Sequence, residues 1–268
     1  MKRALWALML MWTAAAISLA QETQPKPEPA AQEAQPKPEA KAPEAAAAEP
    51  LPTIDRVLDK YIEALGGKEA LEKITSRQAK GSFDLPAMGA NGTLTMVAKA
   101  PNKSAMTIDI PGFGVIQMAF DGTVGWENNP MVGMRDLVGK ELAARKRDST
   151  FNGELKYKEL YQKIEVKGKE KVAEKDAYVV EATPAEGSAE KMYFDAQSGL
   201  LVRHDAERES PQGSALVETY FEDYRDVDGV KVPFTLKQVM PQFTIQIKFD
   251  EVKHNVEIED AKFAKPAA

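Results

Sequence analysis

The sequence predicts a mainly β (α+β) fold, in which an antiparallel sheet curls into a half-barrel with an N-terminal helix and a central helix on its concave face. Apolar and polar residues alternate with period two from Ile74 onward, which indicates half-buried strands. Turn signals such as Asp121-Gly122 and Asp228-Gly229 separate these runs, and connections this short favour antiparallel pairing. Because about ten strands in one sheet do not stay flat and two helices cannot cover both faces, the sheet should curl.

The first twenty residues predict an export signal. Positive charge at residues 1–3 precedes an apolar run over residues 4–17, and Ser18 and Ala20 put small residues where a signal peptidase reads. We expect residues 1–20 to be a signal peptide, cleaved after Ala20, in a periplasmic or secreted protein. A membrane anchor is the alternative, but the apolar run is shorter than the roughly 20 residues that cross a bilayer.

Residues 21–52 predict a disordered linker of Pro, Ala, Glu, Gln and Lys. The pentapeptide beginning at Gln24 is repeated at Gln35, and the segment offers almost no aromatic or branched apolar side chains for a core. Its prolines favour an extended spacer of about 3 Å per residue. It is either a tether that holds the folded domain away from a surface or a solvated tail without a specific role.

The folded domain is predicted over residues 53–268 and begins with a helix. Its apolar residues fall at helical spacing: Ile54, Val57, Leu58, Tyr61, Ile62 and Leu65. Thr53 suits the N-cap, and Gly66-Gly67 ends the helix. A second short helix is expected over residues 68–74.

Strands follow in regular order. The first alternating sets are Leu94, Met96 and Ala98; Met106, Ile108 and Ile110; and Ile116, Met118 and Phe120. The later strands are expected over residues 164–172, 177–182, 191–194, 200–206, 215–224, 230–238 and 243–252. Between these two groups the alternation stops, and Met134, Leu137, Val138 and Leu142 predict the central helix.

Composition excludes several classes of function. The net charge of −6 argues against nucleic-acid binding, which needs a concentrated positive surface. The absence of cysteine rules out disulfides, thiolate nucleophiles, cysteine zinc sites and a lipid-modified N-terminal cysteine.

Three stretches resemble the strand–turn signatures of the LolA/LolB-like superfamily of periplasmic lipoprotein carriers and related lipid-binding proteins. They are Ala119–Trp126, Met192–Leu201 and Phe221–Phe234, and the resemblance extends over residues 53–263. It implies a half-barrel of about eleven strands whose apolar concave face, covered by helices, holds acyl chains. Two features depart from the superfamily: the soluble carrier does not typically have so long a linker, and the anchored receptor has an N-terminal cysteine that this sequence lacks. The resemblance therefore implies the fold and the class of ligand, but not a particular step in lipoprotein transport.

Nine residues are predicted to line an apolar cavity: Met96, Met106, Ile108, Met118, Phe120, Trp126, Leu137, Val138 and Leu142. Methionine adapts to variable acyl chains, although it also fills ordinary cores. Trp126 is expected either at the cavity mouth or packed at a hairpin end, and Leu137, Val138 and Leu142 are expected to close over the ligand.

The sequence predicts no enzyme, no metal site and no cofactor. His204 and Asp205 are adjacent in a strand and face opposite sides, so they make no catalytic dyad, and we expect both His204 and His254 at the surface or at strand ends. Solvated strand faces explain the acidic residues Glu207, Glu209, Glu218, Glu222 and Asp223.

We therefore expect a monomeric lipid or lipoprotein carrier whose partner is an acyl chain. The alternatives are an envelope scaffold with a self-packed half-barrel that binds a protein partner and, third, an envelope hydrolase, for which two histidines and no cysteine are poor material.

Overall fold

The computed structural model describes residues 50–211 and 213–266. The predicted signal peptide and nearly all of the predicted linker lie outside the described residues. The chain divides into two units, of which the second begins at Leu51. Among the described helices, none is long and apolar enough to cross a bilayer.

The described residues form one antiparallel sheet of thirteen strands, two more than the resemblance implied. The strands are β1 (Ser76–Leu85), β2 (Ala90–Lys99), β3 (Lys103–Ile110), β4 (Gly114–Phe120), β5 (Gly125–Asn129), β6 (Gly133–Asp136), β7 (Lys163–Val172), β8 (Lys175–Thr183), β9 (Glu190–Asp195), β10 (Leu201–Ser210), β11 (Gly213–Val227), β12 (Val230–Val239) and β13 (Thr244–His254). Their order is β6-β5-β4-β3-β2-β1-β13-β12-β11-β10-β9-β8-β7. Two meanders are therefore joined where β1 pairs with β13.

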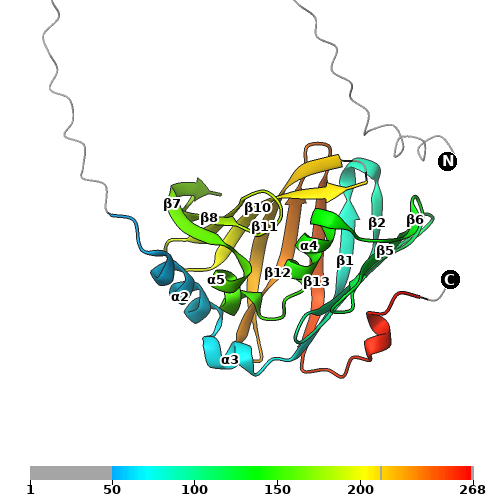
Figure 1. Ribbon diagram of the computed structural model, residues 1–268, viewed down its shortest axis with the longest axis horizontal. Helices are drawn as coiled ribbons and strands as arrows, with labels where there is room; N and C mark the ends of the chain where they lie inside the picture. The colour runs from blue at the N-terminus through cyan, green and yellow to red at the C-terminus, as the bar shows by residue number, and fades with distance from the viewer. Residues whose placement is uncertain (1–49, 212, 267–268) are drawn as a thin grey trace, which may run out of the picture. The chain divides into compact units, whose positions relative to one another are not determined.

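The helices lie on the concave side of the curled sheet, as predicted (Figure 1). They are α2 (Ile54–Leu65), α3 (Lys68–Glu72), α4 (Gly139–Asp148) and α5 (Tyr157–Leu160), with short 3₁₀ turns at Pro86–Met88, Gly153–Lys156 and Asp260–Lys262. The predicted mainly β half-barrel is confirmed.

Helix α2 forms where the sequence predicts it. Thr53 caps it by accepting a hydrogen bond from the Arg56 backbone N–H at 3.3 Å. Its buried stripe of Val57, Leu58, Tyr61 and Leu65 packs into the main core. The Tyr61 ring meets Phe194 of β9 edge-on, with 5.1 Å between the centroids, so α2 covers the β7–β12 arm of the sheet.

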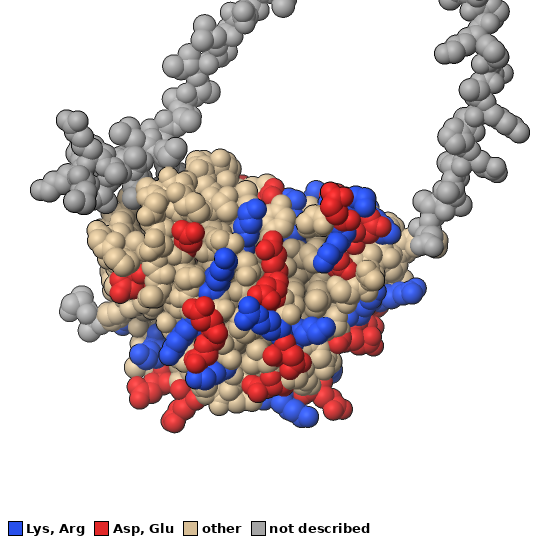
Figure 2. All heavy atoms as spheres, turned by 180° about the vertical axis from the view of Figure 1, so that it is seen from behind, with Lys and Arg blue, Asp and Glu red and all other residues tan. Residues whose placement is uncertain are grey.

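The C-terminal segment after β13 crosses the convex face over the other arm. Asp260 pairs with Lys99 and Lys103, both at 2.8 Å, and Phe263 is fully buried. Seen from behind, the surface carries interleaved Lys/Arg and Asp/Glu side chains (Figure 2). The upper left of this view carries few charged side chains.

Candidate functional site: the concave face and the helix across it

The concave face carries a row of three methionines on neighbouring strands. Met96 of β2 is paired directly with Met106 of β3, and Met106 with Met118 of β4. We call these residues the methionine row. All three are half-buried, whereas Ile108 and Phe120, on the same face, are 5% and 1% exposed. The row is therefore the more accessible part of this apolar surface.

Half-buried apolar side chains continue on the far side of the β1–β13 seam. Ile245 of β13, Leu236 of β12 and Phe221 of β11 pack against the same core, and register pairs Leu236 with both Ile247 and Phe221. The concave face thus carries apolar, partly accessible residues on both arms of the sheet.

Helix α4, which we call the strap, connects the two arms. It contacts β5 and β10, which are separated in the sheet by β4, β3, β2, β1, β13, β12 and β11. At its β5 end, Leu142 and Leu137 pack on Gly125: a Cβ at Gly125 would lie 3.0 Å from Leu142 Cδ1 and 3.1 Å from Leu137 Cδ1. A larger residue there would push the strap away from the sheet.

Ion pairs add to the packing on Gly125 in holding the strap. None of its ten residues, all of them described, is buried. On the β5–β6 side, Arg135 of β6 binds Glu127 of β5 at 2.8 Å and Glu141 of the strap through both terminal nitrogens. On the β10 side, Lys140 pairs with Glu209 at 2.8 Å. Because the Lys140–Glu209 pair is exposed, solvent screens it and it is a weak attachment.

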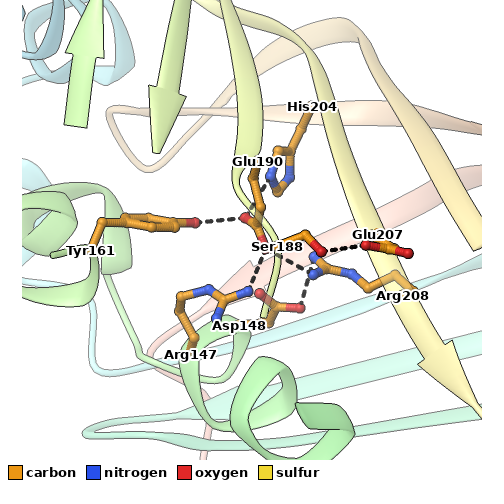
Figure 3. A network of polar contacts seen from close by, with 8 residues as sticks. All are labelled: Arg147, Asp148, Tyr161, Ser188, Glu190, His204, Glu207 and Arg208. Carbon is orange, nitrogen blue, oxygen red and sulfur yellow. Dashed lines mark hydrogen bonds and ion pairs between the residues drawn. The ribbon is translucent and has the colours of Figure 1, made fainter. Parts of the chain in front are cut away.

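The innermost attachment of the strap is the Glu190 cluster (Figure 3). Glu190 begins β9, and its side chain is 2% exposed. Its carboxylate binds the guanidinium of Arg147 from the last turn of the strap and accepts a hydrogen bond from Arg208 Nη1 of β10 at 3.0 Å. His204 Nε2 lies 2.9 Å away, and the Tyr161 hydroxyl donates at 2.9 Å.

The cluster keeps Glu190 ionised. Burial alone would raise its pKa, but the His204 hydrogen bond and the charges of Arg208 and Arg147 outweigh burial and hold the pKa at about 2. Asp148, 3.2 Å from Arg208, supplies a second negative charge. Four groups from three segments thus converge on one carboxylate, which fixes the strap to β9 and β10.

Sequence reasoning missed Glu190, although a signal was present. Glu190, Met192 and Phe194 alternate along one strand, and the last two are buried on the concave face. Extending the strand one residue toward the N-terminus would have placed a carboxylate in the core, where it needs a partner.

His204 differs from its predicted surface or strand-end setting, whereas His254 lies at a strand end as predicted but is buried. His204 lies within β10, in contact with Glu190. His254 does end β13, but its side chain is only 1% exposed, and its Nε2 accepts a hydrogen bond from Arg77 Nε at 3.0 Å. Because an arginine can only donate, His254 is uncharged and carries its proton on Nδ1.

Two of the nine predicted lining residues face away from the concave side. Trp126 lies in β5, not in a loop, and is paired between Ala119 and Asp136 on the convex face, since its neighbours Gly125 and Glu127 face the strap. Its Nε1 donates to the Phe263 carbonyl at 2.9 Å. Val138 precedes the strap and is 68% exposed.

The predicted central helix is wrong at its start. Residues 133–136 form β6, and the helix begins at Gly139, so Met134 lies in a strand. The structure keeps six predicted residues on the concave face: Met96, Met106, Ile108, Met118, Phe120 and Leu142. Leu137 is 4% exposed and packs beside Leu142 on Gly125.

A surface pocket of about 390 Å³ lies elsewhere, where the ends of β1 and β2 meet the C-terminal segment. Thr75, Lys99, Glu257 and Asp260 are among its lining residues, and none of the nine predicted residues is. Among the described residues, no three His, Asp or Glu side chains are grouped to hold a metal ion.

No family model matches the sequence, and no curated protein matches it. Several solved structures do resemble the fold. A DUF1329 family protein from Desulfovibrio piger superposes with a TM-score of 0.56 at 15% identity, covering 79% of this chain and 97% of its own. A candidate outer membrane lipoprotein-sorting protein domain from Vibrio parahaemolyticus gives 0.55 at 13% identity, covering 78% and 96%.

A LolA superfamily protein from Nitrosomonas europaea gives a TM-score of 0.54 at 14% identity, covering 80% of this chain and 99% of its own. At such identities the likeness concerns the fold and not the activity. The match nevertheless extends over almost the full length of all three proteins. The chain has a LolA-like fold.

Proposed function

We propose that this protein is a non-enzymatic carrier that binds the acyl chains of a lipid or lipoprotein on its concave face. The observation that carries the proposal is the methionine row, in which three flexible apolar side chains stand side by side and half-accessible beside the strap. Each Å² of apolar surface that a ligand covers contributes about 25 cal/mol, and methionine adapts to chains of different shape.

Two further points support the proposal. Two of the proteins with similar folds are named for lipoprotein sorting or for the LolA superfamily. The expected signal peptide over residues 1–20, which lies outside the described residues, would deliver the chain to the bacterial periplasm, where acylated cargo is exchanged between membranes. The predicted linker would then give the domain reach.

The test compares two adjacent positions of one strand. Met106 faces the strap side, and Thr107 faces the opposite side of the sheet. We expect full-length protein, purified from a bacterial periplasm without detergent, to carry a stoichiometric lipid or acylated peptide in native mass spectra and solvent extracts. Met106→Asp should lose this adduct, whereas Thr107→Asp should keep it.

Two results would count against the proposal that acyl chains bind on the concave face. A clean unliganded mass together with no uptake of offered lipids would contradict the carrier and favour the scaffold, in which a self-packed half-barrel binds a protein partner. An adduct lost equally in both variants would place the ligand somewhere other than the concave face.

A further inference from the structure

Arg145 projects from the strap onto the methionine row. Its Nη2 lies 3.5 Å from Sδ of Met118, the member of the row that lies on β4. Among the described residues, no carboxylate lies within 4 Å of its guanidinium. The only polar contact of Arg145 side-chain nitrogens within the described chain is therefore a thioether sulfur, which is a weak acceptor.

The neighbouring arginines are all paired with carboxylates. Arg135 binds Glu127 and Glu141, Arg147 binds Glu190, and Arg208 binds Glu190 and Asp148. These ion pairs occupy the acidic groups near Arg145. Among the described residues, none of these carboxylates lies within ion-pair distance of its guanidinium. Arg145 differs from these neighbours in contacting Met118 of the methionine row while having no ion-pair partner among the described residues.

An unmatched guanidinium beside apolar side chains is unfavourable by itself. Burial lowers the pKa of Arg145, with Asp148 opposing the shift, but arginine keeps its proton in proteins. The planar fork of donors matches the oxygens of a carboxylate or a phosphate, and in a partly dry site such charge-assisted hydrogen bonds are strong. An oxyanion is the group that would complete this site.

We propose that Arg145 binds the anionic headgroup, a carboxylate or phosphate, of the amphiphile whose acyl chain lies on the methionine row. This assignment rests on the proposed function and names the ligand class: an acidic amphiphile rather than a neutral one. The acyl chain of the ligand covers Met118 and its neighbours, while the anionic headgroup reaches Arg145 on the strap. One ligand therefore contacts both the methionine row and Arg145.

The test is a titration of delipidated full-length protein with ligands of equal chain length. The probes are dodecanoate, dodecyl phosphate and uncharged dodecanol, with inorganic phosphate as the headgroup alone. We expect the two anionic amphiphiles to bind at least tenfold more tightly than dodecanol, and inorganic phosphate alone to bind far more weakly than dodecyl phosphate. Comparing the affinities for dodecanoate and dodecyl phosphate shows whether the site prefers a carboxylate or a phosphate headgroup.

Variants assign the preference to Arg145. Arg145→Gln should weaken the anionic amphiphiles about tenfold and leave dodecanol unchanged, and Arg145→Lys should restore part of the loss. The control is Lys146→Gln, because Lys146 is the adjacent strap cation but is exposed; it should bind all probes as the wild type does. Thermal unfolding of each variant checks the fold.

The outcomes separate the two proposals. If neither the anionic amphiphiles nor dodecanol bind the wild type, the carrier function fails. If all three bind equally well, the carrier stands and the Arg145 assignment is overturned, a result that needs no variant. Binding of inorganic phosphate as tight as that of dodecyl phosphate would also overturn it, since the site would then recognise a free anion.

Discussion

At the residue scale, Glu190 is the side chain on which the strap depends most. Glu190→Gln would keep the shape but leave Arg147 without its carboxylate partner and Arg208 with Asp148 alone, around a side chain that is 2% exposed. Breaking a buried ionic network in this way costs about 3–5 kcal/mol. We expect this loss in urea unfolding at pH 7, against a much smaller change for Glu207→Gln, because Glu207 is exposed.

The same carboxylate gives a pH signature. Its folded-state pKa of about 2 lies below the ordinary value of 4.5, so its contribution is fully present above pH 4.5 and is lost as the pH falls from 4.5 toward 2. The shift corresponds to about 3 kcal/mol. Unfolding free energies measured across this window should fall less steeply in Glu190→Gln; equal slopes in both proteins would contradict the assignment.

His254 should affect the stability of the folded state at a higher pH than Glu190 does. Burial, followed by the adjacent Arg77 charge, lowers its pKa below 6.5. Since the folded state then resists protonation, its stability is complete above pH 6.5 and declines as the pH falls below that value. An NMR titration of the imidazole signals should show His254 titrating below 6.5. His254→Gln, which keeps an acceptor for Arg77, should remove this component of the pH dependence.

At the element scale, Gly125 tests whether the strap can be loosened without losing the sheet. Gly125→Val would place a branched side chain against Leu142 and Leu137, and overpacking of this kind costs about 1–3 kcal/mol. We expect faster hydrogen exchange in the strap and unchanged protection in β1 and β13. Gly168→Val in β7 is the matched control, because a Cβ there meets no atom within 4 Å. Equal exchange in the two variants would contradict the prediction.

The elements also show which parts of the fold the sequence could predict. Strands such as β2, β4 and β13 are recognisable because apolar residues fill their concave positions. In β5 and β6 those positions hold Gly125, Glu127 and Arg135, while the apolar Trp126 faces outward, so the alternation is inverted and the sequence predicts neither strand. The charged residues that bind the strap therefore interrupt the alternation of apolar and polar residues by which β5 and β6 would be recognised.

The candidate site was predictable only in part for a related reason. The methionine row follows from periodicity along single strands, but the register that aligns Met96, Met106 and Met118 depends on pairing. The Glu190 cluster joins β9, β10, the strap and Tyr161, and nothing local in the sequence links residues that far apart. Arg145 stands out only in the structure, which shows that the neighbouring arginines bind carboxylates and that Arg145 binds none among the described residues.

At the scale of the whole molecule, the seam between β1 and β13 has a kinetic consequence. Arg77 and His254, which meet across it, are separated by 177 positions in the chain, and the two meanders are continuous only through this pairing. Such non-local contacts make folding slow, because the entropy of closing the intervening loop must be overcome before the contacts form. Strand β13 must be available before β1 can pair with it, so a chain that is still being synthesised cannot complete the sheet until its last strand has emerged.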